Sequence, residues 1–183
     1  SPDGPILVLP AQPAEHEIMS LHLAAGLTDV RRMFADNRIF NQALTFSSTS
    51  RIDSMYGMFG RGAVSFNQPL DFDTSSVTDM GSHRHGHPFG MFLGATSFNQ
   101  TLAWDTSRVL QMKYMFEDAE SFNQPLLWDT GTVSDMGYSF KGASSFNQPL
   151  AWDVSRVTFV GSPVWDNTCS MFHMLWHTAA DFE

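Results

Sequence analysis

The sequence predicts a repeat solenoid of about six coils, and three observations carry that prediction. A phrase close to SFNQPL occurs five times in the 183 residues. Its phenylalanines are separated by 26, 32, 24 and 24 residues, a period typical of solenoids. The positions between the phrases also repeat their residue types. The phenylalanines of the phrase are Phe40, Phe66, Phe98, Phe122 and Phe146.

Composition favours a folded chain and excludes several classes of protein. The chain is 43% hydrophobic and 16% charged, which is typical of a globular protein rather than a disordered one. Its net charge of −9, with no cluster of Lys or Arg, argues against nucleic-acid binding. The single cysteine, Cys169, excludes an intrachain disulfide. The apolar run PILVLP is too short for a transmembrane segment.

The chain divides into three parts. Residues 1–26 contain four prolines before position 14 and then AEHEIMSLHLAAGL, which predicts a short helix that caps the first coil. Residues 27–175 hold the repeats. Residues 176–183 form a C-terminal tail that is expected to close the other end of the stack, because terminal repeats need a polar outer face.

Each coil is expected to contain one or two short parallel strands and one helical turn. The motif V-T-x-M has strand character, and MFEDAE is expected to form the helical turn. A strand at SFNQ would end before the proline of the phrase, because proline donates no ladder hydrogen bond. The Phe, Leu, Trp, Val and Met-Phe positions would stack into one core, because each coil buries its apolar face only against its neighbours.

Two insertions interrupt the repeat at the same point. After Met80 and again after Val160, the expected Met-Phe pair is delayed by eight residues. Equal insertions at one template position should project from the same side of the stack, and such loops often carry contacts. Residues 81–88 and 161–168 are therefore expected to be inserted loops. The proposed partner-binding residues in and beside them are Phe89, Val164, Trp165 and Asp166.

The repeat resembles a known family. Residues 121–158, SFNQPLLWDTGTVSDMGYSFKGASSFNQPLAWDVSRVT, closely resemble the BspA-like surface-protein repeat, and the resemblance covers about residues 27–175. It implies a right-handed, leucine-rich-repeat-like solenoid used for adhesion or protein contact, often at a cell surface, without catalytic residues. The sequence departs from the pattern at the two insertions and at Phe46, Phe72 and Ser139.

Two polar columns are expected to have structural roles. The Asn and Gln of the phrase recur without exception, and stacked amides can hydrogen-bond from coil to coil. The aspartates that follow the aromatic residue either accept hydrogen bonds from the next backbone amides in tight turns, which we favour, or hold calcium between coils. These aspartates are Asp73, Asp105, Asp129 and Asp153.

The clearest candidate metal site is a run of alternating histidines, His83, His85 and His87. An extended loop would place their rings on one side, where they could bind a transition metal, although a solvated loop without metal is the favoured reading. His173 and His177 have the spacing of one helical face but lack the HExxH pattern. Cys169 has no visible catalytic partner. The sequence requires no cofactor.

We expect a non-catalytic module that contacts a protein partner through the solenoid face and the inserted loops. One alternative is a structural accessory subunit of a larger assembly, peripheral to a membrane or within an organelle. Another is a metal-binding or calcium-binding surface protein. The resemblance favours a cell-surface or extracellular location.

Overall fold

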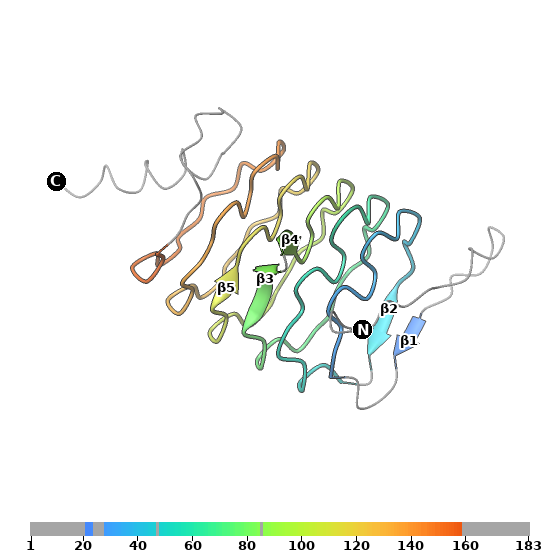
Figure 1. The fold of residues 1–183 in the computed structure, drawn as a ribbon, viewed down its shortest axis with the longest axis horizontal. Helices are drawn as coiled ribbons and strands as arrows, with labels where there is room; N and C mark the ends of the chain where they lie inside the picture. Colours follow the sequence, from blue (N-terminus) through green and yellow to red (C-terminus); the bar gives the residue numbers. More distant parts are fainter. Residues whose placement is uncertain (1–20, 24–27, 47, 85, 159–183) are drawn as a thin grey trace.

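The computed structural model describes residues 21–23, 28–46, 48–84 and 86–158. Over these residues the chain winds through successive coils that lie side by side along one axis (Figure 1). Equivalent residues about one repeat apart are joined by hydrogen bonds, such as Phe92 N–H to the Met115 carbonyl at 2.9 Å. No helix among the described residues has the length and apolarity needed to cross a membrane.

Regular strands are few and short. β1 (Leu21–Leu23) pairs in parallel with β2 (Leu44–Phe46). A second sheet has the order β4-β3-β5, in which β3 (Asp79–Arg84) pairs antiparallel with β4 (His87–Gly90) and parallel with β5 (Gln111–Met112). Isolated parallel bridges at Ser54 and Asp135 extend this pairing to the coils on either side. The parallel pairing of β3, β5 and these bridges falls at the V-T-x-M positions, whereas β1 and β2 pair at the end of the first phrase.

The apolar columns of the sequence form one continuous core. Two rows of phenylalanine rings run along the stack, and equivalent rings in neighbouring coils have centroids 5.3–6.0 Å apart. The two rows contact each other inside each coil, as Phe92 and Phe98 do at 4.1 Å. The indole N–H of Trp104 and that of Trp128 donate to leucine carbonyls of the preceding coil. Each coil thus buries its side chains against its neighbours.

The predicted helical turn is absent, since the described residues contain no helix. Residues 113–118 form turns in which Tyr114 and Asp118 have left-handed backbones, with φ of 58° and 56°. A helix would need these N–H groups for its own carbonyls. Here the N–H groups of Tyr114 and Asp118 donate to the next coil, at Gly137 and Lys141. Bonding between coils replaces helical bonding.

The predicted N-terminal helix is wrong for its middle residues. Leu21–Leu23 form strand β1, which continues the stack by one strand before β2. The remainder of residues 1–26, the second insertion at 161–168 and the tail at 176–183 lie outside the described residues.

Candidate interaction surface

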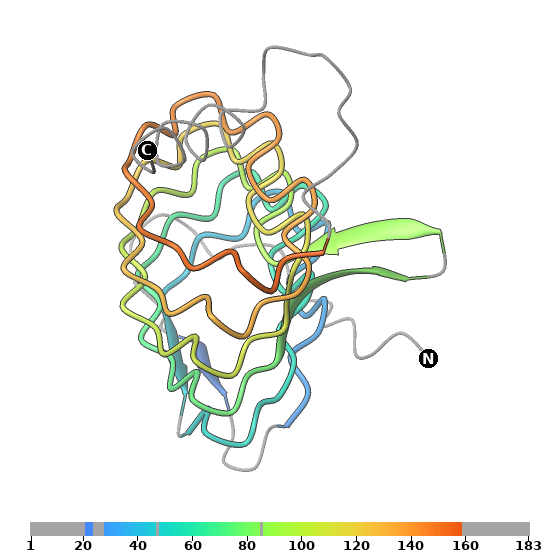
Figure 2. The same ribbon diagram turned by 90° about the vertical axis from the view of Figure 1, so that its left-hand side faces the viewer.

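The first insertion is a β-hairpin rather than an irregular loop. β3 starts in the row of parallel strands, where Asp79 pairs with Gln111, and then leaves the stack together with β4. Figure 2, in which the coils overlap one another, shows the hairpin projecting from one side of the molecule. Arg84 pairs with His87 across a two-residue connection. The hairpin is therefore attached to the stack at its base, where β3 pairs with β5.

Close backbone packing holds that base. A Cβ atom on Gly81 would overlap the Lys113 carbonyl oxygen, and one on Gly90 would overlap the Tyr114 carbonyl oxygen. Only glycine lets the two strands lie this near to the next coil. The sequence places both glycines at the points where the hairpin leaves and rejoins the coil.

One face of the hairpin packs against the preceding coils through Phe89. The ring lies over Gly57, beside Tyr56 at 5.8 Å, and the guanidinium carbons of Arg32 and Arg61 lie 4.8 and 5.9 Å from its centroid. Phe89 is only 4% exposed. The expectation that Phe89 is an exposed partner-binding anchor is therefore wrong, because two arginine side chains and a glycine surface enclose it.

The other face of the hairpin meets a row of aromatic and charged side chains. His83 is exposed, and its ring lies 6.0 Å from that of Tyr114, which stacks on Tyr138 at 5.2 Å with an interplanar angle of 3°. Lys113 and Lys141 lie beside the two tyrosine rings. Burial, together with nearby acidic groups, raises the pKa of Tyr114. The row thus continues the hairpin face across two further coils.

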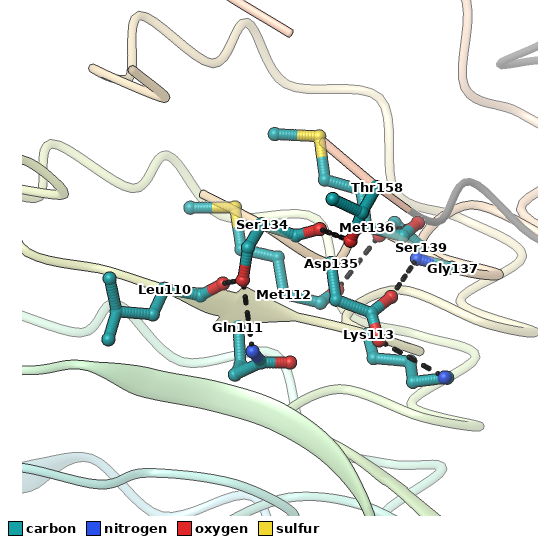
Figure 3. Close-up of polar contacts among 10 residues, drawn as sticks. All are labelled: Leu110, Gln111, Met112, Lys113, Ser134, Asp135, Met136, Gly137, Ser139 and Thr158. Carbon is teal, nitrogen blue, oxygen red and sulfur yellow. Dashed lines mark hydrogen bonds and ion pairs between the residues drawn. The ribbon is translucent and has the colours of Figure 1, made fainter. Parts of the chain in front are cut away.

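Ion pairs between coils fix this row. Lys113 Nζ lies 3.1 Å from Asp135 Oδ2, and Lys141 Nζ lies 2.6 Å from Glu117 Oε1. Figure 3 shows the first pair, together with the hydrogen bond from Gly137 N–H to Asp135 Oδ1. The charges are matched, so the row presents a defined pattern rather than an excess of one sign.

Hydroxyl groups extend the network around β5. The Ser134 hydroxyl donates to the Leu110 carbonyl, and the Thr158 hydroxyl donates to the Ser134 carbonyl (Figure 3). The buried Ser139 hydroxyl lies within hydrogen-bond distance of the Met112 and Met136 carbonyls. This contact gives the serine that replaces the usual methionine a structural role.

The hairpin also corrects the expected histidine site. The chain reverses between Arg84 and His87, so His83 pairs with Pro88 and His87 pairs with Arg84. Side chains alternate between faces along a strand, and therefore His83 and His87 lie on opposite faces. The expected one-sided arrangement is wrong for these two residues, and His85 lies outside the described residues. No group of three metal-ligating side chains occurs within the described part of the chain.

The aspartate column forms the predicted turns. Asp73 Oδ1 accepts hydrogen bonds from both the backbone N–H and the hydroxyl of Ser75, and Asp105 accepts the same pair from Ser107. Asp129 accepts the N–H of Gly131, and Asp153 accepts that of Ser155. Hydrogen bonds from serine lower the pKa of Asp73, Asp105 and Asp153.

The predicted amide ladder is also confirmed. Each Asn Oδ1 accepts the backbone N–H of the asparagine one coil later at 2.8–2.9 Å, from Asn41 to Asn147. The same oxygen accepts the Nε2 of the next coil's glutamine at 2.9–3.1 Å. One side-chain oxygen therefore serves two donors in every step between coils.

Sequence reasoning missed a third polar column. The buried hydroxyls of four threonines donate to the aspartate carbonyl of the following coil. The signal was the recurring Asp-Thr pair, in which only the aspartate received a role. The threonines are Thr49, Thr74, Thr106 and Thr130.

Several expected site residues cannot be placed. Val164, Trp165 and Asp166 lie outside the described residues, as do Cys169, His173 and His177. The hairpin surface, defined here as His83 with Lys113, Tyr114 and Tyr138, includes one residue of the first expected loop. The lysine and the two tyrosines were not among the expected contact residues.

Comparison with known families gives one match. The family model described as "Mycoplasma protein of unknown function, DUF285" matches residues 16–86 and 88–175. No curated protein and no solved structure matches the chain.

Proposed function

The chain belongs to the DUF285 family of Mycoplasma proteins of unknown function, and we propose that it is a non-catalytic protein-interaction module. Its contact region would be the hairpin surface. The observation that carries this proposal is a hairpin that leaves an otherwise regular stack and is packed at its base beside a row of ion-paired lysines and stacked tyrosines.

The packed base of the hairpin supports a binding role. Two close glycine contacts and the enclosed Phe89 fix its base, while His83 and His87 are exposed on its two faces. A preorganised surface loses little conformational entropy when a partner binds. Tyrosine adds contact area with few rotatable bonds, and the stacked Tyr114 and Tyr138 are already ordered.

We extend the proposal to fold class and setting. Coils of about 24 residues, parallel pairing at V-T-x-M and a continuous asparagine ladder support a divergent leucine-rich-repeat-like solenoid of the BspA-like type. That relationship favours adhesion at a cell surface. The asparagine oxygens of the ladder bond to the next coil and the turn aspartates bond within their own coil, so these oxygens have structural roles, which supports a scaffold without catalytic residues.

The test compares three purified chains as bait in a lysate of the source organism. In the first variant, Asn-Gly replaces residues 83–88, which joins Ser82 to Phe89 through a type I′ turn and keeps the packed base of the hairpin. The second is a matched control, Leu127→Ala, which changes a side chain that is 95% exposed elsewhere on the stack. We expect the intact chain and the control to retain the same partner and the shortened hairpin to lose it.

Circular dichroism of all three chains first establishes that the shortened hairpin has left the fold intact. Equal capture by all three chains would place the contact away from the hairpin and contradict the proposed site. Capture of no partner by the intact chain would contradict the interaction role itself.

A further inference from the structure

The amide strip, defined as the Ser-Phe-Asn-Gln stretch and the residue after it in each repeated phrase, has hydrogen-bonding capacity that the fold does not use. The ladder fixes the orientation of each amide group. The asparagine atom that accepts a backbone N–H must be the oxygen, and the glutamine atom that donates to this oxygen must be the nitrogen. The Nδ2 of Asn67, Asn99 and Asn123 therefore faces away from the ladder. Among the described residues, no hydrogen bond uses these Nδ2 groups or the Oε1 of the partner glutamines.

Hydroxyl groups border the amides on one side. Ser97, Ser121 and Ser145 are exposed, and no described residue bonds to their hydroxyl oxygens. In the coils of Ser97, Ser121 and Ser145, a hydroxyl, the asparagine Nδ2 and the glutamine Oε1 therefore lie within four positions of sequence. The first phrase has Ile39 at the serine position, and the Ser65 hydroxyl donates to the Arg38 carbonyl. A buried position would require these groups to be paired, and at this half-exposed strip they remain available to a ligand.

The strip carries no charge, although the chain has a net charge of −9. None of its positions in any of the five phrases is Asp, Glu, Lys or Arg. The residue after the glutamine is Ala43, Pro69, Thr101, Pro125 or Pro149, which adds a largely apolar border. An uncharged ligand with both hydroxyl groups and apolar faces matches this surface, whereas a charged polymer would gain no ion pair along it.

The strip also has a regular spacing. Phenylalanine rings of neighbouring phrases stack with interplanar angles of 3–7° and centroids 5.7–6.0 Å apart, so the amides repeat at about this interval. One ring of an extended, β-linked pyranose chain advances by a similar length. Successive sugars could then meet equivalent groups in successive coils, which would raise affinity with chain length through linked contacts.

We propose that the amide strip binds an uncharged, linear, β-linked polysaccharide lying along the axis of the stack. The hydroxyls of Ser97, Ser121 and Ser145 and the asparagine Nδ2 groups donate to sugar hydroxyls, and the glutamine Oε1 groups accept from them. The proline side borders the apolar ring faces. This site is separate from the hairpin surface and does not depend on the proposed protein contact.

The test is affinity electrophoresis of the full chain in native gels that contain hydroxyethylcellulose. Dextran, a neutral polymer with α-linkages, and carboxymethylcellulose, which is charged, serve as comparison polymers. We expect hydroxyethylcellulose to retard the chain and dextran to leave its mobility unchanged. Retention measured with soluble β-linked oligosaccharides should rise with length up to about one sugar per coil.

Two matched sets of variants localise the binding. Ser97→Val with Ser121→Val removes two hydroxyls, while Ser97→Thr with Ser121→Thr keeps them at nearly the same size. Asn99→Asp keeps the oxygen that serves Asn123 and Gln124 but loses the Nδ2 donors. Losing one neutral hydrogen bond per coil should weaken retention roughly twofold to tenfold, and the threonine variant should bind like the original chain.

Several outcomes would overturn the proposal. These are no retardation by hydroxyethylcellulose, retardation by carboxymethylcellulose alone, or equal retention of the valine and threonine variants. A dimer in sedimentation that the valine variant dissociates would assign the strip to a second copy of the chain instead. The shortened hairpin should retain polysaccharide binding, so failure of this site and failure of the protein contact are distinguishable.

Discussion

At the scale of single residues, the side-chain oxygen of Asn99 accepts a hydrogen bond that a backbone carbonyl accepts in a paired strand. Asn99 Oδ1 accepts both the Asn123 N–H and the Gln124 Nε2, at 2.9 and 3.0 Å. Among the described residues, the Asn123 N–H has no main-chain acceptor. The asparagine supplies the missing acceptor, which explains why Asn recurs in all five copies.

Replacing that oxygen should destabilise the stack. Asn99→Ala leaves a part-buried N–H without its acceptor, and we expect the free energy of unfolding to fall by about 1–3 kcal/mol. Urea denaturation followed by circular dichroism measures the change. Leu127→Ala is the control, because that side chain is 95% exposed and belongs to no ladder contact. Similar losses in the two variants would show that the ladder contributes little.

The aspartate turns predict a pH dependence of stability. Hydrogen bonds from the Ser107 hydroxyl and N–H lower the pKa of Asp105 below its ordinary value of 3.8. A group whose pKa is lower in the folded chain stabilises that chain above its unfolded pKa. The stabilisation is lost as the pH falls through the folded pKa. We therefore expect stability to decline below about pH 4.

Ser107→Ala tests this cause directly. It removes the hydroxyl donor and should raise the pKa of Asp105, which carboxyl NMR titration measures. Asp153 is the control, because its pKa is lowered by hydrogen bonds from Ser155, which the variant leaves unchanged. An unchanged Asp105 pKa in the variant would contradict the assignment of the shift to Ser107.

At the scale of elements, the hairpin depends on two close approaches. Gly81 and Gly90 allow β3 and β4 to pass against the backbone of residues 113 and 114, where any Cβ atom would overlap a carbonyl group. Phe89 then fixes the opposite face between Arg32 and Arg61. Pro88 removes an N–H from β4 and makes its edge a poor template for pairing with another chain.

Gly90→Ala should displace the hairpin from the coil. The new methyl group would overlap the Tyr114 carbonyl in backbone that cannot rotate away, and we expect a loss of at least about 1–3 kcal/mol, as for overpacking. Thermal denaturation measures it. Gly86→Asn is the control, since Gly86 has φ of 79° with open space around it and asparagine tolerates that conformation. Equal stability of the two variants would contradict the close packing.

At the scale of the whole molecule, the contacts of each coil are almost entirely with its two neighbours. The stacked phenylalanines, the amide ladder and the threonine column all join residues about one repeat apart. In such a structure, stability is close to a sum of terms for each coil and each interface between coils.

Deleting residues 109–132 should therefore leave a folded protein. The deletion removes 24 residues and joins Arg108 to Val133, so every later column keeps its position. Guanidinium denaturation should give a lower midpoint and a smaller m-value, because less surface is exposed on unfolding. Deletion of residues 109–120 is the control, since it shifts all later columns by half a coil and should prevent folding. A folded product from the shorter deletion would show that register does not govern the stack.

The structural features that could be predicted are those whose residues recur from repeat to repeat. Asn99 and Asp105 could be given roles because five and four copies at fixed spacing imply contacts between equivalent positions. Features that occur once could not be predicted. Phe89 looked exposed because nothing in the sequence places Arg32 and Arg61, from earlier coils, on either side of its ring.

The histidines show the same limit in another form. Their alternation predicts one shared face only if the chain stays extended, and the chain reverses between Arg84 and His87. The prediction of a helical turn was wrong because nothing in the repeated sequence indicates that the N–H groups of Tyr114 and Asp118 bond to the next coil. The threonine column was visible in principle, since Thr106 and Thr130 follow equivalent aspartates.

The ladder also has a consequence for how the protein is made. When one coil is complete, its asparagine oxygen and its threonine hydroxyl are already in place to bond to the next coil. Strand β1 comes before these coils in the chain and pairs with β2. A ribosome delivers that following coil next, so the nascent chain can add one coil at a time to a finished end. Each addition closes a loop of only about one repeat, which keeps the entropic barrier low. Synthesis and folding of this chain would then advance in the same direction and in the same steps.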